Sequence, residues 1–416
     1  MAAEMLNTVP LLIPLSQQLK ESLSEVQYSP PEASNVSVKS MLLSLLPDAD
    51  SLSNASESQI RSKTIDLVLF CAALASSVDS NYEQLSWIPH TLSTSANLAF
   101  QRLSRAVSCS LVLELMPEML SRVKDTIKES SVNKLDSGND ISSATARAPV
   151  VFAIVAAYQF RWLLTQVECS HLGGICTLVV PCALTALDHW SPEVKGQGMM
   201  SFIHVAKNVN ASDINWYEDA ILDACLQNIT SADEIWHLVV EMSVVILTSI
   251  HQNNPRSSWF ERILTEMLSH LSRQPRHKDR RLAWLQHIEP LFNAIGLVLL
   301  AHFRHIFPLF FKWMHADDDE TVLLVLERIH TVLKLTWIRN SSYIDRLVDE
   351  LIILYKEAAL KVAREEIRSH VVRNLILIQQ CKGTQFEAVW DRYKDDQNLI
   401  AVGQSLHVNV IPVDIH

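Results

Sequence analysis

The sequence predicts an all-α protein built as a right-handed solenoid of paired helices, and three observations support this prediction. Only eight of the 416 residues are glycine, whereas the usual share is about 7%. Sheets and nucleotide-binding loops depend on glycine, so its scarcity favours helices. From about residue 175 onward, helical patterns recur in pairs with a period of about 40–47 residues. Their apolar side chains share one helical face, as do Ile344, Leu347, Val348 and Leu351.

The N-terminal third has a less regular pattern. Residues 1–57 are rich in serine, and we expect a loosely ordered, partly helical lead-in. Residues 58–129 carry N-terminal helices, with apolar patterns at about 58–77 and 95–129. Residues 130–148 show no apolar period and are predicted to be a linker or surface loop. Pro149 suits the first position of the helix that follows.

Residues 149–400 form the predicted repeat region, and residues 401–416 a C-terminal tail. The first helix of each pair is expected to begin near residues 175, 216, 256, 302 and 342. The second helix is expected to begin near residues 192, 233, 277, 318 and 363. A two-helix unit with this period is typical of HEAT and armadillo solenoids. An irregular helical bundle is the alternative architecture.

Composition limits the classes of function. A net charge of −11 argues against binding nucleic acid over a broad surface. Seven cysteines, an odd number, favour a reducing compartment. The N-terminus has no pattern of a signal peptide, and the most apolar stretch, 291–311, contains Arg304. We therefore expect a soluble protein of the cytoplasm, with the nucleus as a second location, and no contact with a membrane.

No catalytic or metal-binding pattern withstands inspection. The acidic run 317–320 lacks an acid four residues after Asp317 or Asp318, so capping of a helix explains it better than a magnesium site. A zinc cluster would need paired ligands at short spacing. In segment 169–189, the cysteines that could bind zinc are separated by longer gaps than this. The possible ligands there are Cys169, His171, Cys176, Cys182 and His189. We expect no cofactor and no enzymatic activity, and an all-α metal-dependent enzyme stays a remote alternative.

One basic segment stands out in this acidic chain. Residues 273–281 hold five basic side chains against Asp279 alone: Arg273, Arg276, Lys278, Arg280 and Arg281. A solvated turn between helices explains such a segment, and a docking patch for an acidic partner is the functional interpretation. Most of the ten tryptophans should fill the core between repeats. Trp313 and Trp337 are candidate partner contacts, because exposed tryptophan marks protein interfaces.

The segments 179–190 (VVPCALTALDHW), 194–198 (VKGQG), 201–208 (SFIHVAKN) and 220–226 (AILDACL) together resemble the conserved block of the Tel-two-interacting protein two family. The residues that carry the resemblance are Asp188, Trp190, Lys195, Gly198, His204, Asn208 and Trp216. The resemblance is clearest over about 175–250 and continues only as a helical pattern to about 400.

This resemblance implies a non-enzymatic α-solenoid scaffold, the Tti-two subunit of the TTT co-chaperone complex. Such a subunit would bind the Tel-two and Tti-one subunits and would help the Hsp90 system mature phosphatidylinositol-3-kinase-related kinases. Telomere maintenance and the DNA-damage response would then depend on it indirectly. A generic HEAT-type scaffold or transport adaptor with other clients is the alternative function.

Overall fold

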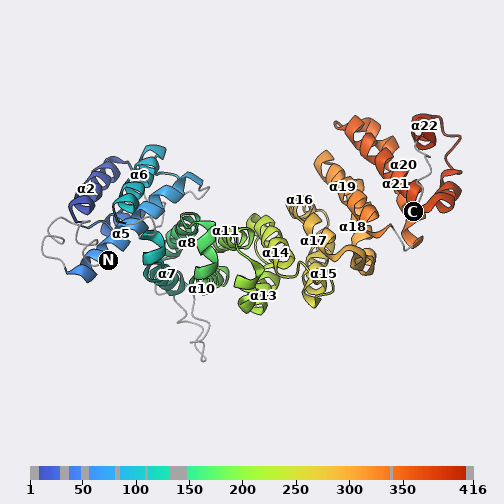
Figure 1. The fold of residues 1–416 in the computed structure, drawn as a ribbon. Helices are drawn as coiled ribbons and strands as arrows, with labels where there is room; N and C mark the ends of the chain where they lie inside the picture. The colour runs from blue at the N-terminus through green and yellow to red at the C-terminus, as the bar shows by residue number, and fades with distance from the viewer. Residues whose placement is uncertain are drawn as a thin grey trace, which may run out of the picture. The chain divides into compact units, whose positions relative to one another are not determined.

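A computed structural model gives the fold of the chain, and Figure 1 shows it as a series of helices. The structure describes residues 9–28, 37–47, 56–79, 85–107, 111–131, 148–337 and 341–408. All regular structure in these ranges is helical, and none of it is strand. The chain forms two compact units, Met1–Ala224 and Cys225–His416, so the division falls inside one helix, α13.

Unit 1 contains successive helices that pack on their neighbours. Its buried centre includes α8, which packs on α5, α7 and α11. The strongly apolar sequence of α8 explains this position, because eleven apolar side chains and Gln159 are buried on all sides of the helix. The elements are α2 (Val9–Glu25), α3 (Val38–Ser44), α5 (Glu57–Ala75), α6 (His90–Val107), α7 (Leu111–Glu129), α8 (Val150–Thr165), α9 (Cys169–Leu172), α10 (Cys176–Leu187), α11 (Pro192–Asn208), α12 (Ala211–Ile214) and α13 (Glu218–Asn228).

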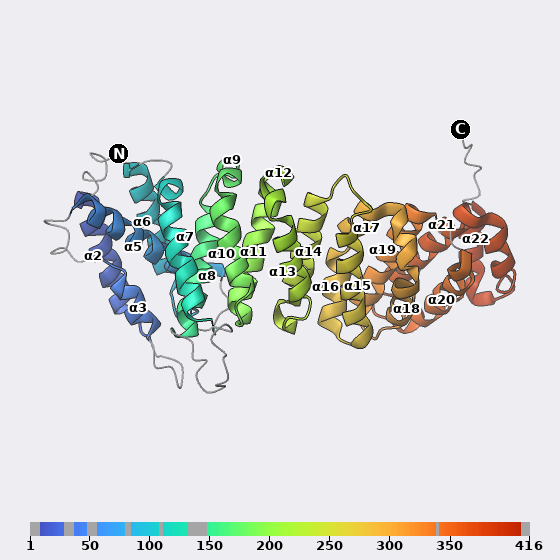
Figure 2. The same ribbon diagram turned by 90° about the horizontal axis from the view of Figure 1, so that it is seen from below.

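Unit 2 has two layers of helices, and Figures 1 and 2 label their members. In one layer α15 packs on α18 and α18 on α20, and in the other α14 packs on α16, α16 on α19 and α19 on α21. The elements are α14 (Trp236–Ile250), α15 (Ser258–Arg273), α16 (Lys278–His287), α17 (Glu289–Ile295), η6 (Gly296–His302), α18 (Phe303–Met314), α19 (Asp319–Thr336), α20 (Ile344–Glu357), η8 (Ala358–Leu360), α21 (Arg364–Trp390) and α22 (Ile400–Val408).

The predicted α-solenoid is confirmed. The observed helices α10, α15, α18 and α20 begin at residues 176, 258, 303 and 344 and correspond to predicted first helices. The helices α11, α14, α16, α19 and α21 begin at 192, 236, 278, 319 and 364 and correspond to the second helices. The one-sided apolar pattern of α20 is buried as predicted, including Leu347, Val348 and Leu351.

The acidic run before α19 caps that helix. Asp318 is the N-cap residue, and its carboxylate accepts a hydrogen bond from the backbone N–H of Thr321 at 2.9 Å. This bond satisfies one of the free N–H groups of the first turn. The same type of cap begins α11, where the Ser191 hydroxyl accepts from the backbone N–H of Val194. The capping interpretation of residues 317–320 therefore accounts for their place in the fold.

Several boundaries differ from the expected ones. The single pattern expected over 95–129 corresponds to two helices, α6 and α7. Residues 401–408, expected in the C-terminal tail, form most of α22, in which Val402 and Leu406 are buried. Residues 132–147 of the expected linker lie outside the described residues, and the helices before and after it, α7 and α8, pack on each other within unit 1.

Two apolar segments are long enough to cross a membrane by length and composition alone, Cys169–Leu187 and Glu289–Met314. Each joins several short elements, and half of its most apolar window is buried inside the protein. Gly296 interrupts the second segment with a φ of +51°, a left-handed conformation that suits glycine. The apolar side chains of both segments therefore pack against other helices of the protein.

Candidate interaction surface

Polar side chains link successive repeats of unit 2 along the turns that precede the second helices. The first link joins Arg280, in the first turn of α16, to Asp233, which precedes α14. Arg280 Nε donates to Asp233 Oδ1 at 2.5 Å, and Nη2 donates to the carbonyl oxygen of Ser231 at 3.3 Å. The guanidinium also lies over the Trp236 ring, 5.4 Å from its centroid. Arg280 is therefore buried between the two repeats.

The second link uses the next residue. Arg281 Nη2 donates to Asp318 Oδ2, and Arg281 Nε donates to Thr321 Oγ1 at 3.0 Å. Both partners lie at the start of α19, in the following repeat. The side chains of Arg281 and Asp318 are largely buried. A charge-assisted pair in such a place is stronger than an exposed one.

The third link is made by Lys361, in the turn before α21. Its Nζ donates to the carbonyl oxygens of Ala316 and Asp317, at 2.6 and 3.0 Å, and lies 3.6 Å from Asp319 Oδ1. The backbone N–H of Ala363 donates to Asp319 Oδ2 at 2.8 Å. We call the three links together the inter-repeat ladder.

The ladder shifts the pKa of two carboxyl groups. The hydrogen bond from Arg280 is the largest cause of the lowered pKa of Asp233, with further contributions from the charges of Arg280 and His277. Burial tends to raise the pKa of Asp318, but hydrogen bonds from Thr321 and Arg281 outweigh it and lower the pKa overall. Both carboxyl groups are held in the charged form that the ladder needs.

The inter-repeat ladder shows that part of the predicted basic docking patch is not a free surface. Of its five side chains, Arg273, Arg276 and Lys278 are exposed, with Lys278 Nζ 3.9 Å from Asp318 Oδ1. The guanidinium groups of Arg280 and Arg281 form bonds between repeats, so they are not available to a partner in this conformation. The local excess of positive charge therefore reflects bonds within the fold as well as exposed groups.

The two nominated tryptophans have opposite environments. Trp313 is only 1% exposed, and its Nε1–H donates to the carbonyl oxygen of Pro275 at 3.0 Å. Its nomination as a partner contact is therefore wrong, because its large ring packs against Trp284 in the core. Trp337 is 62% exposed and ends α19 in the left-handed conformation, with φ of +50°. A non-glycine residue in this conformation costs about 1 kcal/mol or more.

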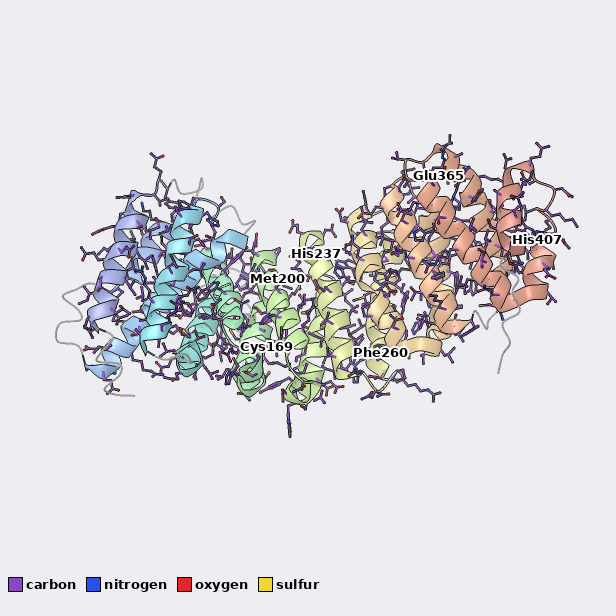
Figure 3. The ribbon with its side chains drawn as sticks, turned by 45° about the horizontal axis from the view of Figure 1, so that its top comes forward. Cys169, Met200, His237, Phe260, Glu365 and His407 are labelled. Carbon is purple, nitrogen blue, oxygen red and sulfur yellow. The ribbon has the colours of Figure 1, made fainter. Side chains whose placement is uncertain are left out.

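A short turn displays two aliphatic side chains in unit 2. Leu360 is 94% exposed and Val362 is fully exposed, although Lys361 between them and Ala358 before them point into the protein. We call residues 358–363 the display turn. Because the ladder bonds of Lys361 and Ala363 hold its backbone, the two apolar side chains are presented in a fixed place. Figure 3 labels Glu365, in the first turn of α21, just beyond the display turn. The sequence did not indicate that these side chains are exposed, because a run of alanine, leucine and valine is typical of a buried segment.

The family-motif residues lie in unit 1, and several have packing roles. A Cβ atom at Gly198 would lie 2.9 Å from the Cβ of Ala186, so glycine lets α10 and α11 approach closely. Asn208 Nδ2 donates to the carbonyl oxygen of His204, and Asn208 Oδ1 accepts from the Cys169 thiol at 3.2 Å. Burial, and then the charge of Arg161, lowers the pKa of His204.

Other motif residues face solvent. Trp216 is 92% exposed in the turn before α13, and Asp188 and Trp190 are exposed after α10. Trp190 stacks on the buried His189, and its Nε1–H donates to the carbonyl oxygen of Ser130 at 3.4 Å. Lys195 lies in the first turns of α11. The motif therefore combines packing positions with exposed aromatic rings.

The possible zinc ligands named from the sequence lie in α9, in α10 and directly after α10. Among the described residues, no three histidine, cysteine, aspartate or glutamate side chains are grouped to hold a metal ion. Burial raises the pKa of the Cys182 thiol, one of the ligands of the imagined zinc cluster, to about 12. A stack of helix pairs with apolar side chains displayed at its turns is the architecture of a helical-repeat scaffold.

Comparison with known proteins places the chain in a family. It is 52% identical over 412 residues to "Uncharacterized protein At2g39910" of Arabidopsis thaliana, covering 95% of this chain and 94% of the relative. The chain belongs to the family of this plant protein. No protein-family model matches the chain.

Two more distant relatives carry a functional name. The chain is 23% identical over 242 residues to TELO2-interacting protein 2 of Homo sapiens, covering 53% of this chain and 47% of that protein. The rat protein of the same name is 21% identical over 249 residues, covering 55% and 48%. The match therefore spans about half the length of these relatives.

Solved structures show weak likeness. An engineered protein aligns over 98% of both chains with a TM-score of 0.40 and 12% identity. Kap121p aligns over 95% of this chain and 49% of its own, with a TM-score of 0.46 and 9% identity. These TM-scores are too low to define a shared arrangement of helices.

Proposed function

We propose that the chain is a non-enzymatic scaffold subunit of a TTT-type co-chaperone complex. Its partners would be the TELO2 and Tti-one subunits, and through them the Hsp90 system and phosphatidylinositol-3-kinase-related kinases. The proposal rests on the distant similarity to TELO2-interacting protein 2. The residues of unit 1 that carry the resemblance to the conserved block of the family support it. We propose the cytoplasm and the nucleus as its locations.

The display turn is the structural observation that carries the proposal. Leu360 and Val362 have no apolar cover, yet the turn that holds them is fixed by Lys361 and Ala363. Burial of such side chains by a partner is favourable by about 25 cal/mol per Å² of apolar surface. A fixed backbone also reduces the entropy lost on binding. The turn therefore has the properties of an interface anchor.

Capture of partners from the same organism tests the proposal. The full chain is immobilised, and purified TELO2 and Tti-one, alone and together, are passed over it. We expect capture by the unmodified chain, and a loss of roughly tenfold or more in affinity for the double variant Leu360→Asp/Val362→Asp. The control is Ile400→Asp, which changes another exposed aliphatic side chain of unit 2.

The outcomes separate the parts of the proposal. Failure of the unmodified chain to capture either subunit would contradict the TTT assignment and leave the helical-repeat scaffold. Capture that is equal for the display-turn variant and the Ile400→Asp control would leave the assignment and move the interface elsewhere. Circular dichroism of each variant checks that the helices are intact.

A further inference from the structure

The display turn presents its two aliphatic side chains as one unit. Lys361 has extended backbone, with φ of −91° and ψ of 153°. Because successive side chains of extended backbone point to opposite sides, Leu360 and Val362 project into solvent while Lys361 points into the protein. The backbone N–H of Lys361 donates to the carbonyl oxygen of Ala358 at 3.0 Å, and Ala358 is fully buried. Leu360 and Val362 together form the apolar anchor of the turn.

The sequence around the anchor has an excess of negative charge. Two segments meet at the turn, 315–319 and 356–366, because Lys361 and Ala363 bond to residues of the first segment. The two segments contain six carboxylates and three lysine or arginine side chains, a net charge of −3. Protonation of His315 would reduce this excess by one charge and leave its sign unchanged.

Ion pairs within the fold already involve two of the three cations. Lys361 Nζ lies 3.6 Å from Asp319 Oδ1, and Lys356 Nζ lies 2.5 Å from Asp396 Oδ2. Asp318 is bonded within the ladder. The other exposed charged groups of the two segments are Asp317, Glu357, Arg364, Glu365 and Glu366. Four carboxylates next to the anchor are therefore opposed by one guanidinium.

Two of the four carboxylates have a basic neighbour at the surface. Arg364 Nε lies 2.9 Å from Glu365 Oε1, and His315 Nδ1 lies 2.6 Å from Glu357 Oε2. If both neighbours carry a full positive charge, the charges of Asp317 and Glu366 still remain. The surface around the anchor is therefore acidic whichever form His315 takes.

We propose that the display turn inserts into an apolar pocket of a partner protein whose rim carries lysine and arginine side chains. Burial of Leu360 and Val362 brings this rim close to Asp317 and Glu366. A basic rim gives complementary charge there, whereas an acidic rim is repelled. This inference rests on the proposed function in taking the display turn as the anchor of a protein interface, and it adds the chemistry of the surface that receives the anchor.

The same charges argue against two other kinds of occupant. The surface of an anionic membrane carries a negative potential, which repels exposed carboxylates. Nucleic acid carries a negative charge at every phosphate and needs a basic surface. A protein pocket with a basic rim is the occupant that satisfies both the apolar anchor and its acidic surroundings.

Site-specific photo-crosslinking identifies the surface that receives the anchor. In the full chain, p-benzoylphenylalanine takes the place of Val362, and the protein is irradiated in a cell extract of its own organism. Mass spectrometry should identify a crosslinked peptide of another protein, from a segment with more lysine and arginine than aspartate and glutamate. The same amino acid in place of Ile400, another exposed aliphatic side chain of unit 2, is the control and should not yield this peptide.

Association kinetics then measure the contribution of the charges. The protein identified by crosslinking is purified, and its binding to the full chain is followed by surface plasmon resonance at low and high salt. The double variant Asp317→Lys/Glu366→Lys should associate about tenfold more slowly at low salt and dissociate at nearly the same rate. The difference between the variant and the unmodified chain should shrink at high salt.

A matched variant controls for the change of charge and of helix position. Glu261→Lys/Glu387→Lys makes the same change at exposed positions of α15 and α21. Glu261 lies in the first turn of its helix, as Glu366 does in α21. This control should associate at the rate of the unmodified chain. Thermal unfolding followed by circular dichroism shows whether each variant keeps its fold.

The outcomes distinguish this inference from the proposed function. Equal association rates for the two double variants, or a crosslinked segment without an excess of basic residues, would overturn the inference. A peptide from a second copy of this chain, or the lack of any peptide specific to position 362, would overturn it too. If the peptide comes from another protein and TELO2 and Tti-one are not captured, slowed association of Asp317→Lys/Glu366→Lys supports the inference while the proposed function falls. If it comes from TELO2 or Tti-one and the rates are equal, the inference alone falls.

Discussion

Arg280 and Arg281 are neighbours in sequence, yet they bond in opposite directions along unit 2. Arg280 reaches back to Asp233, 47 residues earlier, and Arg281 reaches forward to Asp318, 37 residues later. Successive residues in the first turn of a helix point about 100° apart, which lets one pair of arginines bridge three repeats. At the residue scale, the ladder depends on adjacent side chains that have different partners.

Removing one ladder bond should destabilise the fold. We expect Arg281→Gln to lower the free energy of unfolding by about 1.5–3 kcal/mol, because the largely buried Asp318 loses its hydrogen-bonded charged partner and keeps only Lys278, at 3.9 Å. The matched control Arg276→Gln changes an exposed side chain and should stay within about 0.5 kcal/mol of the unmodified chain. Urea unfolding followed by circular dichroism measures both. Equal midpoints for the two variants would contradict the role of the ladder.

Sequence could predict the basic turn but not which of its charges are free. The density of arginine and lysine over 273–281 is visible in the sequence. Exposure depends on carboxylates some 40 residues away, whose approach is set by the stacking of repeats. The same reason applies to Trp313 and Trp337, which look alike in sequence and differ in the fold. The repeat period predicts where helices lie. The partners of a turn residue can be identified only when the positions of the neighbouring repeats are known.

At the scale of elements, the packing of α10 on α11 depends on Gly198. Glycine is unfavourable in a helix by about 0.5–1 kcal/mol relative to alanine. It occurs here because Ala186 and the carbonyl oxygen of Ala183 lie against it, the latter 3.4 Å from the position of a Cβ. The motif glycine is thus explained by close approach of two helices.

Gly198→Ala should destabilise unit 1 in spite of the better helix propensity of alanine. We expect a loss of about 1–3 kcal/mol from overpacking against Ala186. The second change Ala186→Gly should restore part of the loss, because it removes the opposing methyl group. Gly174→Ala is the control, since a Cβ there meets nothing within 4 Å. A thermal midpoint of Gly198→Ala at or above that of the Gly174→Ala control would contradict the packing argument.

Sequence placed the paired helices of the repeat region to within about three residues, because a strong apolar period defines an element better than any local signal does. The sequence did not predict interruptions inside helices. The long helix α21 contains non-helical backbone at Gly383, with φ of +13°. Such breaks depend on where neighbouring helices require the chain to turn.

At the scale of the whole molecule, buried and half-buried histidines contribute to the response to pH. Five of them have a lowered pKa, and burial is the largest cause for each: His189, His204, His270, His302 and His330. In the folded chain these rings are neutral at pH 7. Unfolding exposes them and returns their pKa to about 6.5. The unfolded state therefore binds more protons between that pH and the lowered values.

Stability should therefore begin to fall well above the range where carboxyl groups titrate. It is fully present above about pH 6.5 and is lost as the pH falls toward 4, the approximate pKa of His330. Asp233 and Asp318 add a further loss below about pH 4, because their pKa values are also lowered. Urea midpoints measured at pH 7.5, 6, 5 and 4.5 should decrease steadily. A flat profile between pH 7.5 and 5 would contradict this account.

The inter-repeat ladder also has a mechanical consequence. Each rung joins one repeat only to the next, so a stretching load on unit 2 passes through the rungs in series. Every interface between repeats, with its ladder bonds and its apolar packing together, then carries the full tension, and the weakest interface opens first while the others hold. A chain built in this way yields in steps under force, and its resistance is that of a single interface at a time.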